Sequence, residues 1–116
     1  MILVRIIMNV LPEKQKEVKQ TLFSMIETAG KEKGCLSYEV FCDVDSKTVF
    51  NLIEEWKTPE DLHRHIRSDV FSVLLGTKSL LAKPLDVKIH TVSHTEGAEV
   101  VNALRGKGTS NEKLVK

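Results

Sequence analysis

The sequence lacks the features that mark several classes of protein. No apolar run approaches the ~18 residues that span a bilayer, and the N-terminus has no basic segment followed by an apolar stretch and a small-residue cleavage site. Seventeen Lys and Arg residues stand against 16 Asp and Glu, a formal net charge of +1. Nucleic-acid binding that depends on neutralising backbone phosphates needs a basic patch. We therefore expect a cytoplasmic protein that binds neither membrane nor nucleic acid.

Cysteine is scarce, with Cys35 and Cys42 alone in the chain. On one strand these two residues would lie ~23 Å apart, whereas a disulfide needs Cα atoms closer than ~7 Å. Their odd separation predicts that they point to opposite faces of that strand. Neither has the short spacing to a second Cys or His that a zinc site requires. We expect free thiols and no metal site.

The 116 residues are fewer than the ~150 of a typical domain, and 41% of them are hydrophobic, which predicts one soluble domain. Alternating and helical patterns indicate an order of strand, helix, strand, strand, helix, strand. The expected segments are a strand over 2–10, a helix from 12 to just before Gly34, a hairpin over 36–57, a helix from 59 that breaks at 68–69 and continues to 83, and a strand over 85–92.

This order predicts an α+β fold with an antiparallel, ferredoxin-like β-α-β-β-α-β sheet. Two helical segments cover one face of such a sheet, yet the strands over 2–10 and 48–57 carry apolar residues on both faces. A second copy packed sheet to sheet would cover the other face, so we expect a homodimer of the dimeric α+β barrel type. The domain is expected over 1–95, and the tail over 96–116 is expected to hold a short helix that packs on the partner subunit.

Several motifs resemble the antibiotic biosynthesis monooxygenase (ABM) family. They are Gly34-Cys35-Leu36-Ser37-Tyr38-Glu39-Val40, Leu52-Ile53-Glu54-Glu55-Trp56, Leu62-His63-Arg64-His65 and Ser68-Asp69-Val70-Phe71. The resemblance covers residues 1–93, and it includes the order of the elements.

The resemblance implies a monooxygenase without metal, flavin or haem. Its substrate would be a small aromatic, quinol-like or polyketide-like molecule whose deprotonated anion reduces O₂ directly. The protein then needs to supply an apolar pocket, a base, and donors that hold the anion. The family also contains members with other activities, so the fold alone does not fix the chemistry.

Two residues are the candidate catalytic groups. His65 matches the family's helix histidine, and a helical wheel places it on the flank of a buried side marked by Leu62 and Ile66. A free imidazole titrates near ~6.5, which suits a base at neutral pH. Asn9 is the candidate neutral donor for the anion. The alternative for each residue is a structural hydrogen bond, and His63 is expected at the surface.

Four further residues are candidates for the substrate pocket. Trp56 could stack on an aromatic substrate or simply pack in the core. The Tyr38 hydroxyl could donate to the substrate, with a position in the core as the alternative. Glu54 shares a face with apolar residues, so it needs a partner, for which we expect Arg5 or a residue of the other subunit. Arg5 is also the one strand cation available for an anionic ligand.

Haem degradation, an activity found in the same family, is not expected. The position that we align with the iron-binding histidine is Leu75, and leucine does not ligate iron. His65 stands where those enzymes carry a tryptophan, and their asparagine aligns with Ile7 rather than Asn9. Two other functions stay open: a non-catalytic small-molecule-binding or stress-response dimer, and an isomerase of a small phosphorylated metabolite.

Overall fold

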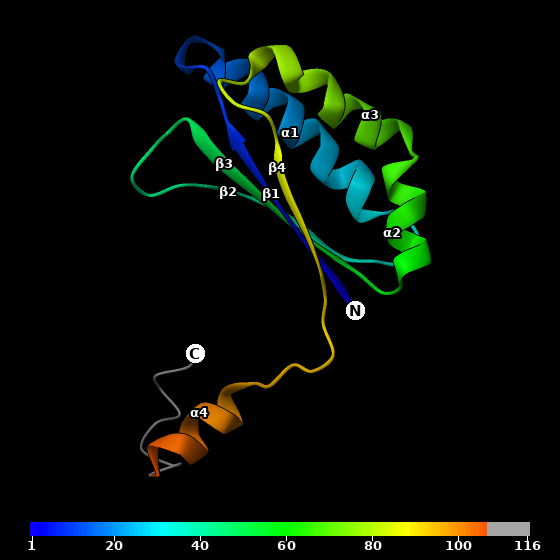
Figure 1. The fold of residues 1–116 in the computed structure, drawn as a ribbon, viewed down its shortest axis with the longest axis vertical. Helices are drawn as coiled ribbons and strands as arrows, with labels where there is room; N and C mark the ends of the chain where they lie inside the picture. Colours follow the sequence, from blue (N-terminus) through cyan, green and yellow to red (C-terminus); the bar gives the residue numbers. More distant parts are fainter. Residues whose placement is uncertain (107–116) are drawn as a thin grey trace.

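The computed structural model describes residues 1–106, which fold into a four-stranded sheet and a set of short helices (Figure 1). The elements in chain order are β1 (Ile2–Asn9), η1 (Pro12–Lys14), α1 (Gln15–Gly30), β2 (Cys35–Cys42), β3 (Val49–Trp56), α2 (Pro59–Ile66), α3 (Asp69–Leu75), η2 (Gly76–Leu80), β4 (Asp86–Thr91) and α4 (Ala98–Arg105). The predicted order of elements is confirmed.

The sheet has the strand order β2-β3-β1-β4, and every neighbouring pair is antiparallel. In β1, Ile2 lies opposite Trp56, and Asn9 lies opposite Val49. The two central strands, β1 and β3, therefore run side by side along their whole length. This is the ferredoxin-like arrangement that the sequence predicts.

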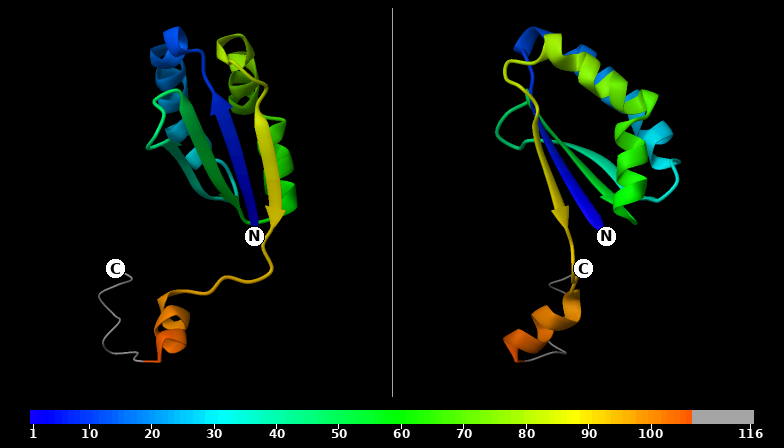
Figure 2. Two further views of the ribbon diagram at one scale, coloured as in Figure 1. Left: turned by 60° about the vertical axis from the view of Figure 1, so that its left-hand side comes forward. Right: turned by 45° about the vertical axis from the view of Figure 1, so that its right-hand side comes forward.

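Helices α1, α2 and α3 all lie on one side of the sheet, which we call the helix face (Figure 2). The even positions of β1 and β3 point to this face and are buried: Ile2, Val4, Ile6, Met8, Phe50, Leu52, Glu54 and Trp56. The other side, the open face, carries the odd positions of both strands, and no helix of residues 1–106 lies over it. Its members in β1 and β3 are Leu3, Arg5, Ile7, Asn9, Val49, Asn51, Ile53 and Glu55, of which Arg5 is exposed and the others are half-buried.

The predicted helix starts are confirmed by their caps. The Thr58 hydroxyl accepts the Asp61 N–H at 3.1 Å ahead of α2, and the Ser68 hydroxyl accepts the Phe71 N–H at 3.3 Å ahead of α3. Such caps satisfy backbone donors that have no partner within the helix. The second helical segment ends earlier than expected, because α3 stops at Leu75 and tightens into the 3₁₀ turn that begins at Gly76.

The predicted orientation of the cysteines is wrong. Cys35 lies opposite Trp56 and Cys42 lies opposite Phe50, so both stand on the helix face. The cause is a β-bulge between Cys35 and Ser37, which inserts one extra residue and reverses the alternation before it. Leu36, expected to share a face with Tyr38, is 55% exposed for the same reason. Both thiols are free, as expected.

The short helix expected in the tail is α4, and it stands apart from the sheet and its helices in both figures. The radius of gyration is 17.0 Å, against about 13 Å for a compact chain of this length. The tail expected over 96–116 lies, from residue 107 onward, outside the described residues. Within the described part of the chain, no helix is long and apolar enough to cross a membrane.

Candidate functional site

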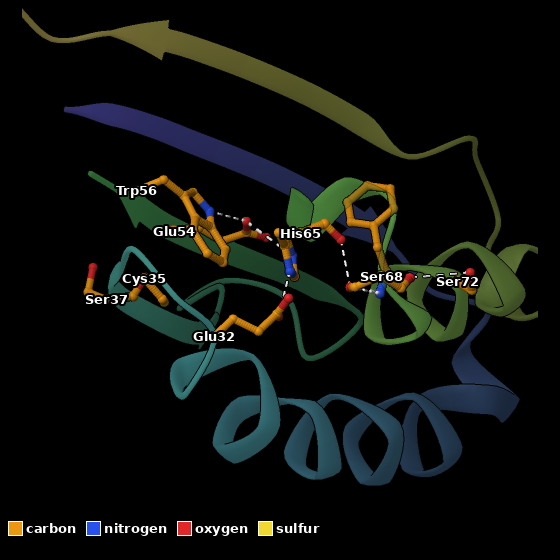
Figure 3. A network of polar contacts seen from close by, with 9 residues as sticks. Glu32, Cys35, Ser37, Glu54, Trp56, His65, Ser68 and Ser72 are labelled. Carbon is orange, nitrogen blue, oxygen red and sulfur yellow. Dashed lines mark hydrogen bonds and ion pairs between the residues drawn. The ribbon is translucent and has the colours of Figure 1, made fainter. Parts of the chain in front are cut away.

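A cluster of buried polar side chains lies where the end of β3 meets α2 (Figure 3). His65 is at its centre and is 1% exposed, and Glu54 is fully buried. Nδ1 of His65 lies 2.7 Å from Oε2 of Glu32, and its Nε2 lies 3.6 Å from Oε1 of Glu54. The imidazole is thus placed between two carboxyl groups that come from different parts of the chain.

The local sequence explains this placement. Glu54 and Trp56 are two residues apart on β3, so both side chains point to the helix face. The indole N–H of Trp56 donates to Oε1 of Glu54 at 2.9 Å. The Thr58 cap and Pro59 then start α2 directly after the strand, and the second turn of that helix carries His65 back over Trp56.

Aromatic rings enclose the imidazole. The Trp56 ring is stacked on it, with centroids 4.5 Å apart and planes inclined by 26°. Tyr38 from β2 and Phe71 from α3 meet it edge-on, at centroid distances of 5.9 and 5.5 Å. Since Phe71 is half-buried, its ring is the most accessible part of this enclosure.

Three buried polar atoms of the cluster have no hydrogen-bond partner among the described residues: Nε2 of His65, Oε2 of Glu54 and the hydroxyl of Tyr38. A buried polar atom without a hydrogen bond costs free energy, so each such atom calls for an explanation, of which a catalytic role is one. Because a carboxylate accepts and does not donate, Nδ1 of His65 carries the proton toward Glu32. Nε2 is then the nitrogen that is free to accept a proton.

Burial raises the pKa of three groups around His65. It raises the pKa of Glu54, an effect that the Trp56 N–H and the nearby His65 oppose in part. It also raises the pKa of Tyr38, to which the Glu54 charge adds. The pKa of the Cys35 thiol is raised by burial and then by Glu54, which disfavours the thiolate and argues against a reactive cysteine here.

The structure brings four of the six predicted site residues together: His65, Trp56, Glu54 and Tyr38. Asn9 and Arg5 lie on the open face, away from the cluster. Asn9 stands at the Val49 end of the sheet and Trp56 at the other end, so the structure does not bring Asn9 to His65. His63 is exposed, as expected.

The expected pairing of Glu54 with Arg5 is wrong, because the two side chains lie on opposite faces of the sheet. Glu54 is instead bonded to Trp56. The expected buried side of α2 also needs correction, since Ile66 is 37% exposed and His65 takes the place beside Leu62. A polar residue thus occupies a core position, which a partner such as Glu32 makes tolerable.

Sequence reasoning missed Glu32 and Phe71. Glu32 lies in the turn between α1 and β2, where no periodic pattern marks a residue as inward-pointing. Phe71 belongs to a motif that was recognised, but its contact with His65 depends on the angle between α2 and α3. Neither contact has a signal in the sequence alone.

Two apolar hollows lie away from the cluster. One, of about 330 Å³, is lined by residues between Leu75 and Leu85, and another, of about 190 Å³, lies between α1 and the β2–β3 hairpin. Among residues 1–106, no group of three or more His, Cys, Asp and Glu side chains is placed to hold a metal ion.

Comparison with known proteins agrees with this architecture. Residues 1–74 match the sequence profile of the antibiotic biosynthesis monooxygenase (ABM) family. A conserved protein from Methanosarcina mazei Go1 is 33% identical, with a TM-score of 0.73, over 77% of this chain and 89% of its own. No match was found among curated proteins.

Two more distant structures share the fold and carry the family's name in their descriptions. The one from Nitrosomonas europaea is 20% identical, with a TM-score of 0.76, over 81% of this chain and 100% of its own. The one from Deinococcus radiodurans is also 20% identical, with a TM-score of 0.78, over 84% of this chain and 97% of its own. The chain belongs to the ABM family.

Proposed function

We propose that the chain is a cofactor-independent monooxygenase that oxidises a small phenolic or quinol-like substrate with O₂. The observation that carries the proposal is the Glu32–His65 pair. Its imidazole is fixed at Nδ1 by a carboxylate 2.7 Å away, while Nε2 makes no hydrogen bond among the described residues and has the Glu54 carboxyl group 3.6 Å away. An oriented imidazole of this kind is the usual arrangement of a general base.

His65 takes the hydroxyl proton of the substrate at Nε2, and Glu32 stabilises the imidazolium that forms. The electron-rich anion then reduces O₂ and forms a C–O bond to one of its oxygen atoms. The O–O bond breaks, the second oxygen atom leaves as water with two hydrogens of the substrate, and the oxygenated carbon becomes a carbonyl, so that the substrate itself supplies all the electrons. The apolar rings of Trp56 and Tyr38 keep water from the anion, and a low dielectric strengthens its interaction with the imidazolium.

Substrate reaches Nε2 when the Phe71 ring moves aside. The ring is half-buried, and it belongs to α3, which is separated from α2 by the break at Arg67 and Ser68. A phenol in its place would lie edge-on to the imidazole. The Tyr38 hydroxyl has no partner among the described residues and would donate to the substrate oxygen.

The proposed enzyme is a homodimer that joins two open faces. Leu3, Ile7, Val49 and Ile53 lie on this face, and α1, α2 and α3 all cover the other side of the sheet. Burial of such apolar area is the main driving force of association. Sedimentation of Ile53→Asp should give a monomer or an aggregate where the natural chain gives a dimer; a 13.1 kDa species from the natural chain at micromolar concentration would contradict the dimer.

Oxygen uptake with a panel of quinols and phenols, including a reduced naphthoquinone, tests the activity. Loss of a general base costs ~10²–10⁴ in rate, so His65→Ala should abolish most of the uptake. His63→Ala, on the same helix but exposed, is the matched control and should keep full activity. Asn9→Ala, far from the cluster, should weaken turnover less than His65→Ala.

Equal uptake by the natural chain and His65→Ala would remove His65 from the mechanism. No uptake by the natural chain across the whole panel would favour the non-catalytic small-molecule-binding dimer instead. In that case, perturbation of Trp56 fluorescence by the same panel would show that the enclosure still accepts an aromatic ligand.

A further inference from the structure

Helix α4 exposes apolar side chains. Val101 is 42% exposed and Leu104 is 83% exposed. Together with Val100 they occupy one side of the helix, at spacings of three and four residues. The helix projects from the domain at the end of β4 and the following segment 92–97 (Figure 1). We call segment 92–105 the arm.

A pocket of matching character lies at the other end of β4. It has a volume of about 330 Å³ and is lined by Leu75, Leu81, Ala82, Pro84 and Leu85, with Lys78 and Lys83. Both lysines are exposed, so the pocket has an apolar floor and a cationic rim. We call it the η2–β4 pocket.

The arm and the pocket are complementary in two respects: the apolar side of the helix suits the apolar floor, and the charge of Glu99 is opposite to that of the rim lysines. A short amphipathic helix fits an apolar groove through anchors spaced three and four residues apart, which are Val100, Val101 and Leu104 here. Glu99 lies in the first turn of α4, where one of its carboxylate oxygens accepts the Gly97 N–H at 3.2 Å. The other oxygen is available to a lysine of the rim.

The arm leaves its own chain at the end of β4 opposite to the pocket. From Leu85 at the pocket to Val92, where the arm begins, the strand covers about 24 Å, and α4 lies beyond that end (Figure 1). To enter its own pocket the arm would have to reverse direction and run back along the whole of β4. A second copy can offer its pocket to the arm without that reversal, which favours an occupant from another molecule.

We propose that α4 docks in the η2–β4 pocket of a second copy of this chain. The inference rests on the two-fold dimer proposed above. If the strands of the two facing sheets run in opposite directions, the end of one copy that carries the arm meets the end of the other that carries the pocket. A two-fold axis makes this contact twice.

Complementation between full-length variants tests the exchange. Leu104→Asp disables the arm and Leu75→Asp disables the pocket; both positions are more than half exposed, at 83% and 54%, so the domain should fold. A lost anchor residue typically weakens an interface about tenfold or more. Each variant alone loses both symmetric contacts, and its dimer dissociation constant should rise about 100-fold in sedimentation equilibrium.

An equimolar mixture of the two variants should form a heterodimer with one intact arm in one intact pocket, about tenfold weaker than the natural dimer. One matched control should leave association unchanged: Val73→Asp, which is exposed on α3 outside the pocket.

Each outcome bears on one claim. A natural-strength dimer from Leu104→Asp or from Leu75→Asp would overturn the arm proposal while leaving the dimer in place. A mixture no tighter than the separate variants would overturn the exchange. A monomeric natural chain would overturn the dimer itself, and oxygen uptake would still test the monooxygenase independently.

Discussion

The imidazole of His65 lies nearly parallel to the indole of Trp56, with ring centroids 4.5 Å apart. The same indole donates its N–H to Glu54, which in turn lies 3.6 Å from Nε2 of His65. One tryptophan therefore fixes both the plane of the histidine and the position of the carboxyl group that faces it. Since Glu54 and Trp56 share a strand, this part of the site is rigid.

Replacement of Glu54 by Gln should change the pH dependence of stability. Burial raises the pKa of Glu54 above its unfolded value of ~4.3, so the folded chain binds more protons than the unfolded chain in the window above ~4.3. The Glu54 contribution thus lowers the free energy of unfolding as pH rises through that window. Glu54→Gln keeps an acceptor for Trp56 and should flatten the decline in urea melts from pH 4 to 8.

Glu55→Gln is the control for this measurement, because Glu55 lies on the open face of the same strand and is half-buried. Its replacement should leave the slope unchanged. The prediction fails if Glu54→Gln and the natural chain lose stability in parallel across the window.

Asp61 should give a pH dependence of the opposite sign. Hydrogen bonds from Arg64 at 2.9 Å and from the Thr58 hydroxyl at 2.8 Å hold its pKa below the usual value. The stabilisation is present above ~3.9, the unfolded value, and is lost as pH falls through the lowered folded pKa. Asp61→Asn should therefore reduce stability at neutral pH and weaken the acid transition below ~3.9, as measured by circular dichroism.

An unchanged acid midpoint in Asp61→Asn would contradict this assignment. Asp69→Asn, exposed in the first turn of α3, is a suitable comparison because it removes the same charge without the same hydrogen bonds.

Gly34 and Gly30 offer a matched pair of stability tests. Gly34 has a φ of +81°, and a Cβ there would overlap the Asp61 side chain, whereas a Cβ at Gly30 meets nothing within 4 Å. Left-handed backbone costs a residue with a Cβ ~1–2 kcal/mol, and the overlap adds to that. Gly34→Ala should destabilise the chain by at least ~2 kcal/mol in urea, and Gly30→Ala, at the end of α1, should stabilise it by ~0.4–1 kcal/mol. Equal effects of the two changes would contradict the geometry.

The order of strands and helices could be predicted because the hydrophobic patterns that indicate them are local and repeat along the chain. Two-residue alternation predicted the strands, and the helical pattern with its break at 68–69 predicted the helices; these elements are present in the structure. The β-bulge beside Leu36 could not be predicted, because one inserted residue leaves the hydrophobic pattern of a short strand almost unchanged. This bulge is what places Cys35 on the helix face.

The site residues that belong to family motifs could be predicted from the sequence. Residues that contact them from a distant part of the chain could not. His65 and Trp56 stand in family motifs, and the helical wheel placed His65 near the buried side. Glu32 contacts His65 from 33 positions earlier in the chain, and only the packing of the turn after α1 on α2 brings it there. Distant pairing of this kind has no periodic signature in one sequence.

Glu32 supplies the sharpest test of the proposed chemistry, as a positioning residue for His65. Glu32→Gln keeps an oxygen that accepts from Nδ1 but removes the charge that stabilises the imidazolium. Because the Glu32 side chain is 21% exposed, the loss of kcat should be smaller than the ~10⁴-fold loss for a fully buried triad carboxylate. We expect kcat for oxygen uptake to fall at least ~10-fold with KM nearly unchanged.

Glu32→Asp restores the charge on a shorter side chain and should recover part of the rate. A merely structural role would instead lower the stability of both variants alike and leave kcat per folded molecule unchanged. Measuring kcat, KM and the urea midpoint on the same three proteins separates the two roles.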